Sequence, residues 1–195
     1  MKPILVIYAT REGHTRHIAE HVAAALEAQQ RSIALIDAAH IPERLLLTQY
    51  SAVIVYASLH LGKHEPEMVK FVKGHLAELQ RIPGMFLSVS LEEVTAEDAT
   101  APPEKRAAAE TNVKRTIDRF LTETGWHPLH VAAVAGALMF SKYNFITRFV
   151  MKRIAEKAGK PVDTTRDYEF TDWTKLDRLI EELVRSIPIE VEEGV

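Results

Sequence analysis

The chain has 195 residues, of which 47% are hydrophobic, a formal net charge of −3 and no cysteine. This size and apolar content predict one globular domain with a complete core. The lack of cysteine excludes disulfides, thiolate metal ligands and cysteine nucleophiles, and the small net charge argues against nucleic acid as a partner. No apolar stretch approaches the roughly 20 residues that span a bilayer, so we expect a soluble, cytoplasmic protein whose membrane contact is peripheral.

Strands and helices are predicted to alternate along the chain. Runs rich in Val and Ile, without polar alternation, predict five strands over residues 2–8, 32–36, 52–58, 85–90 and 131–138. Apolar residues at helical spacing predict helices from about residue 15, over 65–79, over 105–124, and from Thr171 or Asp172 to residue 185. Strands buried on both faces are typical of a parallel sheet covered by helices, so the pattern predicts a doubly wound α/β domain.

The turn after the first strand carries a candidate phosphate site, because ligands of doubly wound sheets bind at the carboxyl ends of the strands. Its residues are Thr10, Arg11, Glu12, Gly13, His14 and Thr15. Hydroxyls, a glycine that permits close approach and the N–H groups of a helix start together favour a bound phosphate. An ordinary loop with Thr15 as the helix N-cap is the alternative. The dinucleotide and Walker motifs are absent from the sequence, which leaves a mononucleotide.

This loop and several later stretches resemble the flavodoxin-like superfamily and, within it, the menaquinone-dependent protoporphyrinogen oxidase family. The matching stretches are residues 9–15, 57–63, 86–91 and 135–138, a basic stretch around Arg148, Phe149 and Lys152, and residues 168–173. The resemblance implies a doubly wound, five-stranded parallel sheet of order 2-1-3-4-5 with helices on both faces. It also implies one domain over residues 1–186, with an insert at about 139–168 near strand five, followed by an acidic tail over 187–195.

The resemblance implies FMN as the cofactor, which would carry the redox chemistry without a metal or a catalytic triad. The implied cofactor-binding residues are Thr10, Arg11, Glu12, Gly13, His14, Thr15, Ser58, Leu59, His60, Leu61, Gly62, Ser88, Val89, Ser90 and Leu91. The two later loops contain no Trp or Tyr to stack on the flavin. Leu59, His60, Leu61 or Leu91, or an aromatic of the insert such as Tyr143, must then contact the ring. Protoporphyrinogen IX and menaquinone or another quinone are the implied substrates.

Residues 139–160 form a basic segment with apolar residues at helical spacing. The apolar residues are Phe145, Ile146, Phe149, Val150 and Ile154, and the candidates for contact with substrate or with an anionic membrane are Lys142, Arg148, Phe149, Lys152 and Arg153. Such a helix suits lipid headgroups or porphyrin propionates. The alternative is a helix whose apolar stripe packs on its own core. We favour membrane or substrate contact, at the inner face of the cell membrane.

Several histidines and acids are candidate polar groups. His60 and His64 could relay protons near the flavin, although surface histidines without such a role are more common. His14, His17 and His21 share one helix face without a visible third ligand group, so we interpret them as a polar face and expect no metal site. The acidic run over residues 92–110 is interpreted as a solvated, flexible loop and helix start.

Two other functions remain open at this point. A flavodoxin-type FMN electron carrier would share the fold, although such carriers usually have a strongly acidic surface. An FMN-dependent NAD(P)H:quinone reductase would also share the fold. The sequence has no nicotinamide-binding motif to support this function, but proteins of this fold can have the activity without such a motif.

Overall fold

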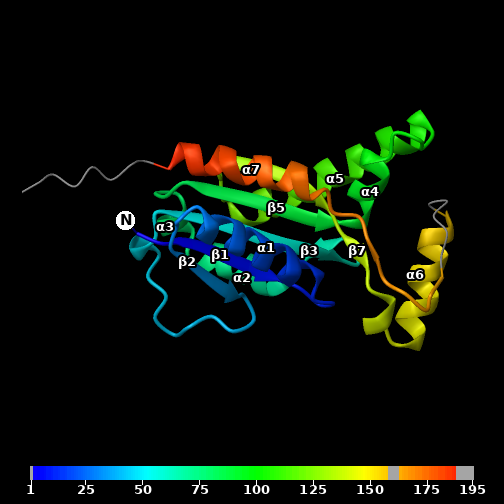
Figure 1. Ribbon diagram of the computed structural model, residues 1–195, viewed down its shortest axis with the longest axis horizontal. Helices are drawn as coiled ribbons and strands as arrows, with labels where there is room; N and C mark the ends of the chain where they lie inside the picture. The colour runs from blue at the N-terminus through cyan, green and yellow to red at the C-terminus, as the bar shows by residue number, and fades with distance from the viewer. Residues whose placement is uncertain (1, 158–162, 188–195) are drawn as a thin grey trace, which may run out of the picture.

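The computed structural model describes residues 2–157 and 163–187. Its main sheet contains the parallel strands β1 (Ile4–Ala9), β2 (Ile33–Asp37), β3 (Ala52–His60), β5 (Gly84–Ser90) and β6 (His130–Ala135) in the order β2-β1-β3-β5-β6. The short strand β4 (Lys63–His64) pairs antiparallel with the end of β3. Without β4, this is the predicted order 2-1-3-4-5, so the predicted fold class is confirmed. The strands end on the side of the molecule where α6 (Phe145–Lys157) lies (Figure 1).

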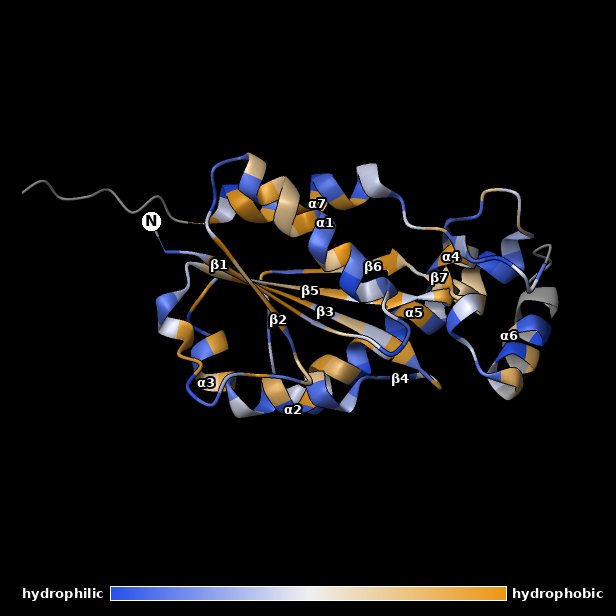
Figure 2. Cartoon of the chain, turned by 60° about the horizontal axis from the view of Figure 1, so that its bottom comes forward, coloured by the Kyte–Doolittle hydropathy of each residue, from blue (hydrophilic) through white to orange (hydrophobic). Residues whose placement is uncertain are grey.

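Helices cover both faces of the sheet. One face is covered by α1 (His14–Ala28) and α7 (Trp173–Ser186), and the other by α2 (Pro66–Gly74), α3 (Leu76–Leu79) and α5 (Pro103–Thr124), as the two sides of the sheet in Figure 2 show. Each strand of the sheet interior is buried on both faces; β1, for example, is buried at every position. This explains why the sequence lacks polar alternation in these strands.

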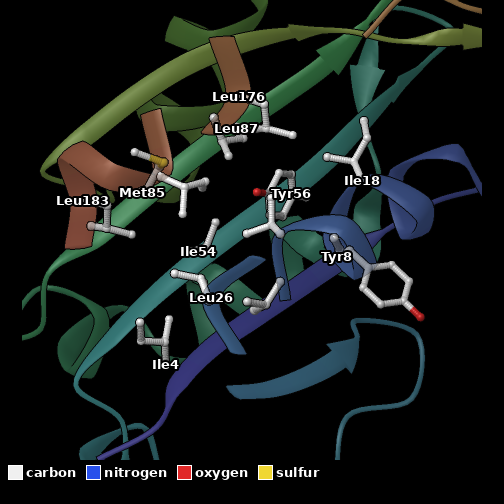
Figure 3. Packing of buried hydrophobic residues seen from close by; sticks show 14 of the residues in the cluster. Ile4, Tyr8, Ile18, Leu26, Ile54, Tyr56, Met85, Leu87, Leu176 and Leu183 are labelled. Carbon is white, nitrogen blue, oxygen red and sulfur yellow. The ribbon is translucent and has the colours of Figure 1, made fainter. Parts of the chain in front are cut away.

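The core between α1, α7 and the sheet contains one unusual polar group. Aliphatic side chains such as Ile54 and Leu87 fill most of this core, and Tyr56 stands among them (Figure 3). The Tyr56 hydroxyl is buried and has no hydrogen-bond partner among the described residues. Burial raises the pKa of Tyr56 well above its usual range. The hydroxyl therefore stays protonated and costs stability rather than adding to it.

Three elements differ from the sequence-based expectation. The helix predicted over 65–79 is divided at His75 into α2 and α3. The strand predicted over 131–138 is interrupted at Gly136, after which β7 (Ala137–Leu138) leaves the main sheet and pairs with β8 (Tyr168–Glu169). The prediction of a flexible loop over 92–110 was wrong for its first part, because α4 (Leu91–Glu97) is a helix that begins at the Ser90 cap.

The insert contains two helical segments, η2 (Phe140–Lys142) and α6, between β7 and β8. Of the tail expected over 187–195, Ile187 is buried and packs on the core, and the remaining residues lie outside the described part of the chain. The short 3-10 helix η1 (Leu47–Gln49) connects β2 to β3. The insert thus joins the domain through the β7–β8 pair, beside the carboxyl ends of the main strands.

Candidate functional site

The loop between β1 and α1 is shaped by Gly13. This residue has φ +90° in the left-handed region and is the N-cap of α1, so the cap is Gly13 and not Thr15. The Gly13 N–H donates to Thr10 Oγ1 over 3.0 Å, which closes the turn. The first N–H groups of any helix have no acceptor within the helix and favour an anion in front of them. The loop therefore has the geometry of an anion site.

Arg11 and Ser58 connect this loop to the end of β3 through one buried carboxylate. The Arg11 Nε donates to Glu65 Oε2 at 2.7 Å, and the Ser58 Oγ donates to Glu65 Oε1 at 3.2 Å. Glu65 is only 2% exposed, and its two oxygens are thereby both satisfied. The Arg11 guanidinium is engaged with Glu65 and Glu67. Arg11 belongs to the loop, and these contacts connect the loop to α2.

The loop after β3 is a two-residue hairpin turn. Leu59 pairs with His64 and His60 with Lys63, so Leu61 and Gly62 form the turn. Both have positive φ, of 50° and 73°. Turns of this type need positive φ at both central positions, which glycine or asparagine adopts readily and leucine does not. Leu61 nevertheless occupies the first of the two central positions, and 90% of its surface is exposed. The edge of the site therefore carries an apolar residue with a strained backbone.

A cavity of about 800 Å³ lies where the three loops meet. It falls within the size range of small-molecule and cofactor pockets, roughly 300–1,000 Å³. Twelve of the predicted cofactor-binding residues line it: Thr10, Glu12, His14, Thr15, Ser58, Leu59, His60, Leu61, Gly62, Val89, Ser90 and Leu91. Arg11, Gly13 and Ser88 do not line it. The structure therefore brings the three predicted loops together around a single cavity.

Ser88 lies behind the cavity wall and bonds to a buried histidine. The His64 Nε2 is 2.8 Å from Ser88 Oγ, and the His64 ring is packed edge-on against Phe86 and Phe120 at centroid distances of 5.3 and 5.0 Å. Burial, with a smaller contribution from Arg119, lowers the pKa of His64 to about 4. His64 is therefore neutral near pH 7 and is not a surface histidine, contrary to the expectation from sequence.

Helix α5 and the insert supply two further walls of the cavity, and most of their lining residues were not predicted from the sequence. Helix α5 contributes Asn112, Arg115, Thr116 and Arg119, and the insert contributes Met139, Tyr143, Thr147 and Met151. The α5 positions follow helical spacing, and this polar stripe on one face was the signal that could have revealed them. Tyr143 was considered from sequence, and it does line the cavity.

Tyr143 and Glu12 are two titratable groups of the cavity with raised pKa values. Burial raises the pKa of Tyr143 to about 12, and its hydroxyl accepts a hydrogen bond from the Met139 N–H at 3.3 Å. Burial also raises the pKa of Glu12, and nearby His60 lowers it less. A carboxyl group with a raised pKa beside an imidazole is suited to exchanging a proton.

The outward face of the insert exposes aromatic side chains beside basic ones. Phe145 is 86% and Phe149 is 55% exposed, and the Arg153 guanidinium lies 5.3 Å from the Phe149 ring centroid. The two phenylalanines therefore do not pack on the core, contrary to the alternative considered from sequence. The Arg148 Nη2 donates to Phe140 O at 2.9 Å, which fixes α6 to the segment before it. Lys142 and Lys152 are exposed on the same segment. The side chains of Ile146, Val150 and Ile154 lie outside the described atoms.

His14 occupies the boundary between the cavity and the β8 strand. Its ring is buried, and its Nε2 lies 2.9 Å from Thr171 Oγ1. Burial lowers the pKa of His14, against a smaller opposite effect of Glu169. Because the side chain is buried, the interpretation of His14 as part of a polar surface was wrong.

Comparisons with known proteins place this geometry among flavin-binding folds. Residues 5–165 match the family model described as Flavodoxin domain. Protoporphyrinogen IX dehydrogenase (quinone) of Escherichia coli (strain K12) is 30% identical over 181 residues, which are 92% of this chain and 93% of that protein. The protein of the same name from Leishmania major is 29% identical over 187 residues, 96% of this chain and 76% of that protein.

Solved structures agree in fold. A short-chain flavodoxin associated with a non-canonical PDU bacterial microcompartment gives a TM-score of 0.57 at 12% identity, over 96% of this chain and all of that one (100%). An NADH:FMN oxidoreductase in its apo form gives 0.54 at 13% identity, over 97% and 92%. None of the helices within the described residues is long and apolar enough to cross a membrane.

Proposed function

Because the chain belongs to the flavodoxin domain family, in the branch of the protoporphyrinogen IX dehydrogenases, we propose that it is an FMN-dependent enzyme of haem biosynthesis that oxidises protoporphyrinogen IX to protoporphyrin IX. Menaquinone or another quinone is the proposed electron acceptor. The observation that supports this most strongly is the cavity of about 800 Å³. It lies where three segments meet: the loop over residues 10–15, called here the phosphate-type loop, the β3–β4 hairpin and the insert. A plain electron carrier has no need of a cavity wall supplied by such an insert.

The residues of the cavity fit a flavin mononucleotide. The left-handed Gly13 and the start of α1 provide the anion site for its phosphate, and Thr10 and Thr15 line the cavity at that end. The apolar side chains of Leu61, Leu91 and Met151, with the Tyr143 ring, suit an isoalloxazine ring. When bound, the flavin supplies the hydride acceptor and donor of the reaction. Tyr143 takes the aromatic role that the two loops cannot fill.

Glu12 is the residue that we assign to proton exchange. Oxidation of a porphyrinogen releases protons together with hydride equivalents, so a group near the ring must accept them. The raised pKa of Glu12 and its position in the cavity beside His60 suit this task. His64 does not, because its pKa of about 4 and its bond to Ser88 keep it neutral and engaged. We therefore assign the proton exchange to Glu12, beside His60, rather than to His64.

The insert is also the proposed site of peripheral membrane contact. Thr147 and Met151 line the cavity, while Phe145 and Phe149 on the same helix are exposed. A helix with basic side chains and exposed aromatics at the mouth of a cavity suits an anionic lipid surface. A quinone dissolved in that membrane would reach the cavity without crossing water. This proposal places the protein at the inner face of the cell membrane.

An anaerobic assay tests the proposal. Purified protein is supplied with FMN, protoporphyrinogen IX and a menaquinone analogue, and porphyrin fluorescence is followed. We expect fluorescence to rise only when protein, flavin and quinone are all present. A flavin spectrum with no porphyrin formation would contradict the substrate assignment. A parallel assay with NADH or NADPH as donor distinguishes a quinone reductase, and reduction of a redox partner without either activity distinguishes a carrier.

A further inference from the structure

Three side chains that are distant in sequence present nitrogen and oxygen atoms to one point. His14 and His17 lie on the first turn of α1, and Glu169 lies on β8. The Glu169 Oε2 is 3.9 Å from His14 Nδ1 and 3.6 Å from His17 Nδ1. The ligand atoms of the three residues all lie within 4.8 Å of one another. His14 is buried, whereas His17 and Glu169 are 61% and 39% exposed, so the point is reachable from solvent.

The hydrogen bonds around His14 determine which of its nitrogens is available. The Thr171 hydroxyl donates its single hydrogen to Ala135 O at 2.8 Å. It can therefore only accept from the His14 Nε2–H, which is 2.9 Å away. In the neutral ring this leaves the lone pair on Nδ1, directed toward Glu169. Histidines that bind metals almost always donate their other N–H to a fixed acceptor in this way.

Glu169 is oriented in the same manner. The Trp173 Nε1–H donates to Glu169 Oε1 at 2.9 Å, which leaves Oε2 facing the two imidazoles. The Trp173 ring also packs edge-on against His17 at a centroid distance of 5.4 Å. Hydrogen bonds or ring packing thus restrain each of the three side chains. This arrangement is more than an acidic cluster, because two of its three groups are imidazoles.

We propose that His14, His17 and Glu169 bind a divalent transition-metal ion, with zinc as the best match. Two imidazole nitrogens, one carboxylate oxygen and an open position form a common four-coordinate zinc environment. At bond lengths of roughly 2.0–2.1 Å, tetrahedral ligand atoms are about 3.3 Å apart. The ligand atoms, of which Glu169 Oε2 is now 3.6 and 3.9 Å from the two Nδ1 atoms, must move closer on binding, and His17 and Glu169 are the partly exposed side chains that would make this adjustment. The Glu169 carboxylate offsets the positive end of the α1 dipole, which opposes a cation here.

The ion would join the start of α1 to the strand that closes the insert. Because His14 also lines the cavity, the metal would hold the phosphate-type loop and the β7–β8 pair in one arrangement. In this proposal water fills the fourth, open position, and the ion joins the two segments and takes part in no redox step, because zinc has no redox chemistry. It does not depend on the proposed function, since it can be measured without flavin, porphyrin or quinone.

The test is a metal titration of protein that carries no affinity-tag histidines and has been stripped with a chelator. Zn²⁺ is titrated against a chromophoric chelator, and Co²⁺ is added separately to record its visible spectrum. We expect one equivalent of Zn²⁺ to bind and to raise the melting temperature, and Co²⁺ to give the intense bands of a four-coordinate site. Absence of stoichiometric Zn²⁺ binding would overturn the proposal.

Surface variants separate this site from ordinary histidine–carboxylate pairs. His17→Gln and Glu169→Gln should each abolish the one-equivalent binding, because both side chains are partly exposed and the fold should tolerate the change. His40→Gln is the matched control, since the exposed His40 Nδ1 lies 3.6 Å from Asp37 Oδ2 and this pair has no third ligand group within residues 2–157 and 163–187. Binding unchanged in His17→Gln and Glu169→Gln, or lost equally in His40→Gln, would contradict the site.

Thr171 provides a second readout. Thr171→Val removes the acceptor that fixes His14 and should weaken Zn²⁺ binding by about 10- to 100-fold, as loss of such supporting hydrogen bonds does. Thr171→Ser keeps the hydroxyl and should retain affinity. Equal affinity of the Val and Ser variants would show that His14 does not ligate the ion.

Discussion

The His64 Nε2 is held 2.8 Å from the Ser88 hydroxyl oxygen, and the His64 ring packs edge-on against the stacked rings of Phe86 and Phe120. Its pKa of about 4 lies below the ordinary value of 6.5, so the unfolded chain binds a proton that the folded protein refuses. The stability that depends on neutral His64 is therefore fully present above pH 6.5 and is lost as the pH falls toward 4, by about 3 kcal/mol. Urea unfolding at pH 7.5 and pH 4.5 measures this loss.

The comparison with His64→Gln isolates this histidine from other titrating groups. Glu12 and Glu93 have raised pKa values and act in the opposite direction, but they are present in both proteins. The stability gap between wild type and His64→Gln should shrink by about 3 kcal/mol between pH 7.5 and 4.5. A constant gap for His64→Gln would contradict the buried, neutral state.

Substitution of Leu61 should raise the stability of the fold and weaken flavin binding. Leu61→Asn relieves the left-handed strain at φ 50° and should stabilise the fold by about 1 kcal/mol. The same change removes an apolar side chain from the cavity edge and should weaken flavin binding. Chemical unfolding and flavin fluorescence titration measure the two effects. Leu46→Asn is the control, because Leu46 is also exposed but has φ −104° and should gain nothing.

Removing the Tyr56 hydroxyl should increase stability. The group is buried without a partner among the described residues, and Tyr56→Phe removes its desolvation cost, a gain of about 1 kcal/mol. The neighbouring strand residue Tyr8, paired with Tyr56 in the sheet register, provides the control variant Tyr8→Phe, whose effect should be near zero. Loss of stability in Tyr56→Phe would reveal a buried water or other partner for the hydroxyl.

The exposed phenylalanines of α6 predict binding to anionic vesicles. Phe145→Ser together with Phe149→Ser should abolish co-flotation with vesicles that contain anionic lipid, because both anchoring side chains are lost. Leu129→Ser, at an exposed leucine outside the insert, should leave flotation unchanged. Vesicles of zwitterionic lipid should bind the wild type less, since the basic side chains then lack partners. Equal flotation of wild type and double variant would rule out this contact.

The sequence predicted the elements whose signal is local. The apolar runs predicted the five parallel strands, and the N-cap expected at Thr171 or Asp172 is Asp172, whose side chain accepts from the Lys175 N–H at 2.9 Å. The spacing of residues 10–15 likewise predicted a turn that the structure places at the cavity. Each of these features depends on a few consecutive residues.

The unpredicted features depend on contacts between distant segments. The third group beside His14 and His17 is Glu169, which reaches α1 only because β8 pairs with β7. The polar stripe of α5 is visible in the sequence, but its place in the cavity wall depends on how that helix packs on the face of the sheet. The burial of His64 likewise depends on Phe120, a residue of α5. A single sequence does not reveal the β7–β8 pairing or the contact of His64 with Phe120, because no local pattern encodes contacts between distant segments.

The last prediction concerns the phosphate-type loop. Thr15→Ala combined with Gly13→Val should abolish flavin retention, because a β-branched residue at φ +90° is strained and the Thr15 hydroxyl at the cavity wall is lost. The strain costs roughly 1–3 kcal/mol, so circular-dichroism melting must show that the variant remains folded. Gly74→Ala is the matched control, since Gly74 has open space and no positive φ. Flavin content equal to wild type in a folded double variant would refute the assignment of the phosphate to this loop.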